Sequence, residues 1–163
     1  MAEPVAFGRR LAGSEAFKAM FREGMAMVEE TATYLDRDGR SESQRLSRAG
    51  TLGYATESMR LTTRLMQLAS WLLLQRAVNE GDMSADQAAL ERAKVKLGGV
   101  SSTTEGQTWD DLPDRLRTLI DRSLRLQERI VRLDAALRQP VEAGNNPIAR
   151  ELDRLAEAFG GSK

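Results

Sequence analysis

The sequence predicts an all-α protein, an antiparallel three-helix bundle with a short accessory helix and a flexible C-terminal tail. The stretch Met59–Ala77 contains no Gly or Pro and is rich in good helix formers. From Leu112 to Leu137, apolar residues recur at alternating spacings of four and three, the period of one helix face. Aromatic residues make up only 5% of the chain, fewer than an all-β core is expected to need. A length of 163 residues fits one domain.

The chain is expected to begin with a loosely ordered arm and then a long helix. The arm, residues 1–13, contains Pro4 and Gly13, and Ser14 is a suitable N-cap for the first helix. Gly39 is expected to end this helix in a left-handed conformation. One helix face is apolar, at spacings of four and three: Phe17, Phe21, Met25, Val28, Ala32 and Leu35.

The second helix is predicted to be the central one. Ser41 and Gln44 suggest a capping box near its start, and Gly81 is expected to end it. Its apolar residues form two rows, so the helix must be covered on more than one side. It is either the middle helix of the bundle or a bundle helix that also meets a second subunit. One row is Met59, Met66, Leu73 and Ala77. The other, interpreted as a core band or a dimer interface, is Leu61, Leu65, Leu68 and Leu72.

Methionines cluster in the first two predicted helices. Their flexible thioether side chains suit either an adaptable binding surface or an irregular core. We expect them to fill the core between these helices: Met20, Met25, Met27, Met59 and Met66.

The rest of the bundle domain, which spans residues 14–139, contains a short polar helix and a third long one. A capping box at Ser84 and Gln87 predicts the accessory helix, ending near Leu97. The third helix is predicted to run from Pro113, in its first turn, to Pro140. Its acidic and basic residues fall at favourable spacings for pairing with each other on a solvated face, as in Asp121 with Arg125 and Glu128 with Arg132.

The tail, residues 140–163, is expected to be flexible or weakly helical. A linker containing Pro147 precedes a short amphipathic segment. Because isolated helices this short are marginal in water, the segment is predicted either to order on a partner or to fold back on the bundle. Its apolar residues are the predicted partner-binding anchors: Ile148, Leu152, Leu155 and Phe159.

Composition argues against most chemical functions. The chain has no Cys and no His, which removes thiol nucleophiles and the commonest general base and metal ligand. No catalytic residues, cofactor site or metal site are predicted. The net charge is zero, which argues against binding to nucleic acid. The apolar runs are too short and too interrupted by Arg to span a membrane, so a cytoplasmic protein is expected.

Two long stretches resemble a known family, the regulator of CtrA degradation (RcdA) family of alphaproteobacteria. The first, Pro4–Met25, reads P-V-A-F-G-R-R-L-A-G-S-E-A-F-K-A-M-F-R-E-G-M. The second, Tyr54–Ser84, contains the central helix, including M-R-L-T-T-R-L-M-Q-L-A-S-W-L-L-L-Q-R-A. The resemblance is strong over the first half of the chain and extends to the rest by layout.

This resemblance implies a homodimeric three-helix bundle that acts as a non-enzymatic adaptor for the ClpXP protease. The response regulator CpdR would prime ClpX, and the adaptor would deliver cargo directly or through the cyclic-di-GMP-binding protein PopA, which brings the cell-cycle regulator CtrA. The family's tail is implicated in partner contacts. The alternative is a structural homodimeric helical module in a signalling or transcription complex.

Overall fold

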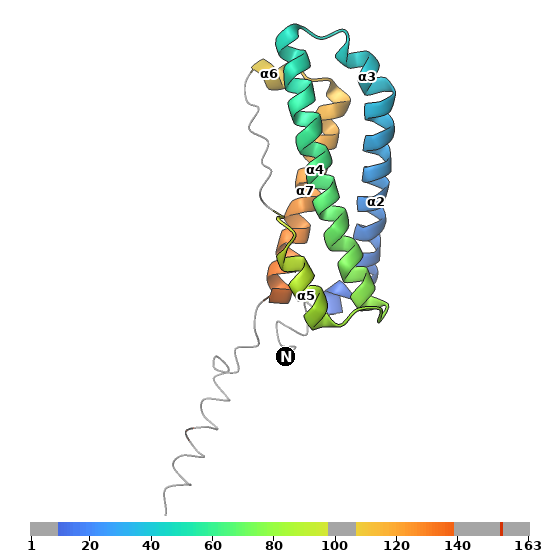
Figure 1. The fold of residues 1–163 in the computed structure, drawn as a ribbon, viewed down its shortest axis with the longest axis vertical. Coiled ribbons are helices and arrows are strands. Elements are labelled where there is room, and N and C mark those ends of the chain that lie inside the picture. The colour runs from blue at the N-terminus through green and yellow to red at the C-terminus, as the bar shows by residue number, and fades with distance from the viewer. Residues whose placement is uncertain (1–9, 98–106, 139–153, 155–163) are drawn as a thin grey trace, which may run out of the picture.

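Three long helices lie side by side in the computed structural model, which describes residues 10–97, 107–138 and 154 (Figure 1). They are α2 (Glu15–Asp36), α4 (Arg48–Asn79) and α7 (Asp114–Arg138). Short helices occupy the connections: α3 (Asp38–Ser43), α5 (Ala85–Ala93) and α6 (Gln107–Asp110). The described residues contain no strand, so the predicted all-α fold is confirmed. None of their helices is both long and apolar enough to cross a bilayer.

The directions of the long helices differ from the prediction in one respect. Helix α2 is antiparallel to α4, as expected, but α7 is parallel to α4 (Figure 1). Two buried hydrogen bonds fix this direction: Arg64 on α4 bonds Ser123, and Trp71, one heptad further along α4, bonds Asp134. Helix α5 lies at the end of the bundle where α4 stops, and α6 lies at the opposite end, so α7 begins at the end where α4 also begins (Figure 1).

The second long helix begins later than predicted. The Oγ atom of Ser47 accepts a hydrogen bond from the backbone N–H of Gly50 at 3.1 Å and caps α4. Ser41 lies instead within α3, and Gln44 follows it, so the predicted capping box at these residues is wrong. The predicted N-caps Ser14 and Ser84 do accept such bonds, from Phe17 and Gln87. Helix α5 ends at Ala93, four residues before the predicted end.

Gly39 does not end the first helix by a left-handed turn, because among the described residues only Gly81 has a positive φ, of 80°. Gly39 lies inside α3, where a Cβ atom would come within 2.6 Å of the Tyr54 hydroxyl and 2.8 Å of the Tyr34 carbonyl oxygen. Close packing therefore explains the glycine at position 39. Gly81 takes the left-handed conformation just after α4, where the helix was predicted to end.

The core lies between the three long helices. Leu61, Leu68 and Leu72 are at most 1% exposed, and Leu65 is 3% exposed. They pack in one cluster with residues of α2 and α7: Phe17, Met27, Tyr34, Leu116, Leu119, Ile120, Leu126, Ile130 and Leu133.

Part of the predicted arm also packs against the bundle. Arg10, Leu11 and Ala12 are helical, and Ala12 is 1% exposed. Its carbonyl oxygen accepts a hydrogen bond of 2.6 Å from the side-chain amide of Asn79, at the end of α4. Ordered packing thus begins before Ser14, and residues 1–9 lie outside the described part.

Candidate protein-interaction surface

The outer face of α4, turned away from the core, carries no exposed charge for most of its length. Every exposed residue from Thr51 to Leu73 is uncharged, and the charged residues in this stretch are buried or half-buried. Four large apolar side chains project from this face at strict seven-residue spacing, and we call them the outer stripe. They are Leu52, Met59, Met66 and Leu73, which are 70%, 71%, 59% and 52% exposed.

Small residues lie between the members of the outer stripe. The exposed residues among them are Ala55, Thr62, Thr63 and Ser70. Large apolar residues one heptad apart, with small residues between them, let a second helix approach closely along the surface. The stripe spans about 30 Å at the rise of an α-helix. An exposed apolar surface of this extent is typical of a protein-interaction site.

The exposed face of α7 is charged, in contrast to the uncharged outer face of α4. Exposed positions on α7 are mostly charged, and three of its arginines cross to the preceding elements. Arg122 pairs with Glu30 at 2.8 Å and Arg129 with Glu23 at 2.6 Å, while Arg115 pairs with Asp38 at 2.9 Å.

The predicted pairing of charges within α7 is therefore only partly correct. Glu128 and Arg132 form the expected pair at 2.5 Å. Arg125 bonds the backbone carbonyl of Asp121, at 3.4 Å, rather than its carboxylate. The heptad-spaced arginines instead join α7 to the first helix and to α3.

A shallow groove of about 340 Å³ borders the outer stripe where the chain leaves α5. We call it the α4–α5 groove. Met66, Gln67 and Ser70 form one wall, and Lys94, Val95 and Lys96 form the other. The Lys94 ammonium pairs with Glu91 at 2.9 Å, and Lys96 is exposed. The groove thus combines apolar contact from Met66 and Val95 with a basic rim, and Met66 makes it continuous with the outer stripe.

The interior contains charged groups that join helices. Arg64, 1% exposed, donates a hydrogen bond of 3.0 Å from Nη1 to the Ser123 hydroxyl on α7. Burial lowers the pKa of the Arg64 guanidinium, and the nearby carboxylate of Glu57 opposes that change. Glu57 is itself 0% exposed and pairs with Arg60 at 2.8 Å. Arg64 and Glu57 are enclosed by the bundle, and the bond from Arg64 to Ser123 joins α4 to α7.

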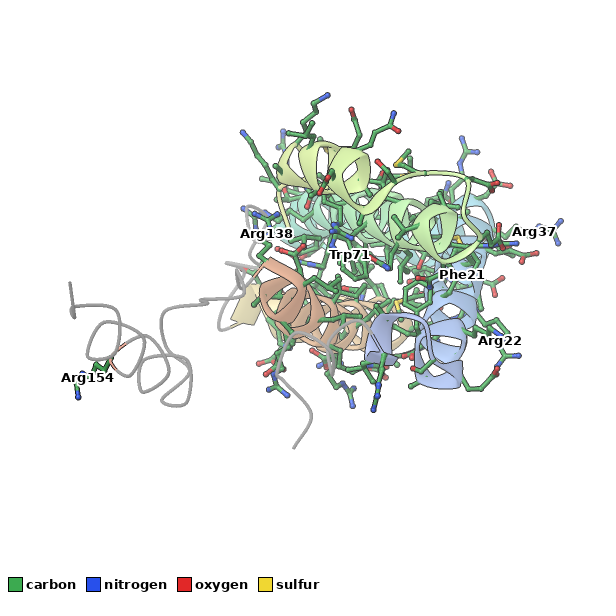
Figure 2. The ribbon with its side chains drawn as sticks, turned by 90° about the horizontal axis from the view of Figure 1, so that it is seen from below. Phe21, Arg22, Arg37, Trp71, Arg138 and Arg154 are labelled. Atoms are coloured by element: carbon green, nitrogen blue, oxygen red, sulfur yellow. The ribbon has the colours of Figure 1, made fainter. Side chains whose placement is uncertain are left out.

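A second polar network fixes the end of the bundle at which α7 stops. The indole N–H of Trp71 donates to the Asp134 carboxylate at 2.9 Å, and Arg138 pairs with the same carboxylate at 2.8 Å. Arg138 also donates to the carbonyl oxygen of Arg92, at 3.5 Å. Figure 2 labels Trp71 and Arg138 in a view along the bundle. The buried Arg92 side chain bonds Gln75 on α4, and burial lowers its pKa.

The opposite end of the bundle is held by a tyrosine. The Tyr34 hydroxyl donates to the Glu42 carboxylate at 2.7 Å, and the Arg115 guanidinium lies over the ring, 5.1 Å from its centroid. Burial, with the hydrogen bond to Glu42, raises the pKa of Tyr34 above its ordinary value. Among the described residues no group of His, Cys, Asp or Glu is arranged to hold a metal ion.

The structure separates the two apolar rows predicted on the central helix. The row interpreted as core or dimer interface lies inside the single chain: Leu61, Leu65, Leu68 and Leu72. In the other row Met59, Met66 and Leu73 are exposed, and Ala77 is half-buried. Met27 is buried, and Met20 and Met25 are partly buried against the core, but the prediction that Met59 and Met66 fill the core is wrong.

The sequence signal for the outer stripe was its spacing. Leu52 lies one heptad before Met59 and extends the row of Met59, Met66 and Leu73. The residues three and four positions after Leu52, Met59 and Met66, which lie beside the row on the helix, are uncharged. The predicted tail anchors lie outside the described residues: Ile148, Leu152, Leu155 and Phe159.

Two comparisons place the chain among known proteins. The profile of a family described as "Protein of unknown function (DUF1465)" matches residues 8–159. The crystal structure of RcdA from Caulobacter crescentus CB15 is similar, with 52% sequence identity and a TM-score of 0.63. The match covers 76% of this chain and 92% of that one. No match was found among curated proteins.

Proposed function

The chain belongs to the RcdA family and itself matches the DUF1465 profile, and on that premise we propose that it is a non-enzymatic adaptor that delivers cargo to the ClpXP protease. The cargo includes cell-cycle regulators such as CtrA. In this proposal CpdR primes ClpX, and a PopA-like cyclic-di-GMP-binding protein brings CtrA to the adaptor. The protein acts in the cytoplasm, where these partners operate.

The single observation that carries this proposal is the 52% identity to RcdA, and the outer stripe on a rigid scaffold agrees with it. An adaptor must hold surfaces for several partners in fixed positions, and it needs no reactive group. The outer face of α4 is uncharged and accessible. Behind it, the core and the buried bonds of Arg64 and Trp71 join α4 to α7. Binding there would require little rearrangement of the bundle.

We assign self-association to the outer stripe. A homodimer with two-fold symmetry places the same surface of each copy against itself. Because exposed residues from Thr51 to Leu73 are uncharged, two copies meet without like-charge repulsion. The heptad spacing provides four apolar side chains on each copy, and the small residues between them give room for the partner's large ones.

The tail is proposed to contact partners through its apolar anchors. A flexible connection of a cargo-binding segment to a docked scaffold raises the local concentration of cargo at the protease. In this proposal the bundle positions the adaptor and the tail engages a partner through Ile148, Leu152, Leu155 and Phe159.

The test is reconstituted degradation of CtrA by ClpXP with CpdR and PopA. The reaction would contain the full chain, a chain ending at Gln139, or no adaptor. The full chain is expected to accelerate CtrA loss, and the truncated chain to accelerate it less. Equal rates with the full chain and with none, when every partner is shown to be active, would reject the adaptor role. The helical interaction module would then be the remaining function.

Self-association is tested separately, by light scattering during size-exclusion chromatography. The double variant Met59→Glu, Met66→Glu is expected to elute as a monomer. Val131→Glu is the matched control, because Val131 is an exposed apolar residue, 40% accessible, on α7. An unchanged dimer in the double variant would show that the outer stripe is not the interface.

A further inference from the structure

We propose that helix α5 and the N-terminal turn, residues 10–12, form a coupled latch, in which the release of either one from the end of α4 loosens the other. A row of side-chain hydrogen bonds connects these two elements across α4. We call this row the amide relay, and it consists of Arg92, Gln75 and Asn79. The inference concerns the chain alone and does not depend on the adaptor role.

The amide relay runs from α5 to the N-terminal turn. The Arg92 guanidinium on α5 donates a hydrogen bond to Oε1 of Gln75 on α4. Nε2 of Gln75 donates to Oδ1 of Asn79, about one helical turn further along α4, at 3.0 Å. Nδ2 of Asn79 donates to the Ala12 carbonyl oxygen at 2.6 Å. Figure 1 shows the turn and α5 at the same end of the bundle, where α4 stops.

The two ends of the relay fix the orientation of both amides between them. An arginine side chain can only donate hydrogen bonds, and a backbone carbonyl oxygen can only accept them. Gln75 must therefore turn its oxygen toward Arg92, and Asn79 must turn its nitrogen toward Ala12. A flipped amide would place two donors or two acceptors against each other. Each end thus helps to hold the amide on which the other end depends, and bonds in such a row strengthen one another.

Both elements depend on their contact with α4 for their order. Helix α5 has 9 residues, of which Ala88 and Arg92 are buried. This is shorter than the length of about 12–15 residues below which an isolated helix is marginal in water. The N-terminal turn is shorter still, and its Ala12 is 1% exposed. Neither element has a core of its own, so each is expected to open at a lower free energy than the bundle.

Release of α5 changes the bonding of Gln75. Because Gln75 is 3% exposed, loss of Arg92 would leave its oxygen as a buried acceptor without a donor, which costs free energy. The amide can avoid this cost by rotating toward water, and it then withdraws its nitrogen from Asn79. Asn79 is exposed to solvent and can then turn away from Ala12. The same steps in reverse carry the loss of the turn to α5.

The latch makes two parts of the surface respond together. A binding partner that holds α5 against α4 would also hold the N-terminal turn, and one that detaches either element would loosen both. Thermodynamic linkage makes the coupling equal in the two directions. Side chains in one hydrogen-bond network couple strongly enough to change an opening equilibrium by about tenfold.

Amide hydrogen exchange, followed by NMR in the full chain, tests the latch. The Ser14 amide reports the turn, because it donates to the Leu11 carbonyl oxygen at 3.2 Å. The Ala88 amide reports α5, because it donates to the Ser84 carbonyl oxygen at 3.0 Å. Arg92→Met is expected to speed exchange at both amides by about tenfold. Unchanged exchange at Ser14 would show that α5 and the turn open independently and would overturn the proposal.

Leu90→Ala is the matched control on α5, because Leu90 is 69% exposed and lies outside the relay. It is expected to leave exchange at Ser14 unchanged, and an effect equal to that of Arg92→Met would overturn the proposal. The Leu68 amide, in the middle of α4, reports global unfolding and should not change. If Arg92→Met unfolds the bundle, which the Leu68 amide would show, the Gln75→Glu variant decides.

Gln75→Glu tests the direction of the relay with almost no change in shape. The carboxylate still accepts from Arg92, but it cannot donate to Asn79. Asn79 is then expected to turn its nitrogen toward the carboxylate, which breaks its bond to the N-terminal turn. Exchange should become about tenfold faster at Ser14 and no faster at Ala88, because the charged pair keeps α5 in place. An unchanged rate at Ser14, or equal acceleration at both amides, would overturn the proposal.

The reverse direction is tested from the turn. Ala12→Asp places a charge at a buried position and is expected to detach the turn, so exchange at Ala88 should become about tenfold faster. Asn79→Ala cuts the relay. In the Asn79→Ala background, Ala12→Asp should have no further effect on exchange at Ala88. A persistent effect in that background would show that the coupling does not pass through the relay and would overturn the proposal.

Discussion

Removal of the Asp134 carboxylate is expected to destabilise the bundle through Trp71. In the Asp134→Ala variant the buried indole N–H, which donates at 2.9 Å, loses its acceptor inside a side chain that is 0% exposed. A hydrogen bond to a charged group contributes about 1.5–3 kcal/mol. The ion pair with Arg138 adds at most about 0.5 kcal/mol, because the Arg138 side chain is 52% exposed. The free energy of unfolding should fall by about 2–3 kcal/mol.

Urea unfolding followed by circular dichroism measures this loss. With a slope of about 2 kcal/mol per molar urea, the midpoint should fall by about 1 M while the slope stays constant. Asp134→Asn keeps an acceptor for the indole and should lose about half as much. Asp121→Ala on the exposed side of α7 is the control. If Asp134→Ala lowers the midpoint no more than this control, the bond to Trp71 contributes nothing measurable and the reasoning is wrong.

Three further predictions test the packing. Leu61→Ala should lower the free energy of unfolding by about 2–5 kcal/mol, because Leu61 is 0% exposed, and Met59→Ala should lower it by less than about 0.5 kcal/mol, because Met59 is 71% exposed. Equal losses in urea unfolding would contradict the assignment of the two rows. Gly39→Ala should lower the melting temperature more than Gly81→Ala, because a Cβ at Gly39 meets backbone at 2.8 Å whereas at Gly81 it meets only φ strain; the reverse order in calorimetry would show that the contacts at Gly39 relax freely. The free energy of unfolding should fall as pH rises above about 10, because the raised pKa of Tyr34 lets the folded state keep a proton that the unfolded chain has lost. Tyr34→Phe should make this fall with pH less steep. Urea unfolding at several pH values measures it, and the same dependence on pH in the variant would exclude Tyr34 as its source.

Periodicity predicted the helices well because each helix is specified by nearby residues. The stretch Met59–Ala77 lies within α4, and Ser14 and Ser84 cap the helices they were predicted to cap. The direction of one helix relative to another was harder to predict. Nothing local to α7 specifies that it runs parallel to α4, because long-range bonds such as the one from Trp71 to Asp134 join residues that are far apart in the sequence.

The outer stripe was hard to recognise for a related reason. Both apolar rows of α4 satisfy a helical period, and hydrophobicity alone does not tell which row faces the partner helices within the chain. Leu61 and Leu65 turn inward because α2 and α7 both pack on that side. Met59 lies two residues before Leu61 and Met66 lies one residue after Leu65, yet both turn outward. The candidate site is therefore defined by what the bundle leaves uncovered, which only the assembled helices reveal.

Folding and interaction are consequently separable on α4. The core row, with Trp71 and Arg64, supplies the packing that joins α4 to α7. The outer stripe contributes little to that packing, since its four side chains are at least half exposed. Apolar side chains held at heptad spacing on a surface without charge add a risk of aggregation to an isolated bundle. Their presence on one face, while α7 displays paired charges, favours a face that is covered when the protein works.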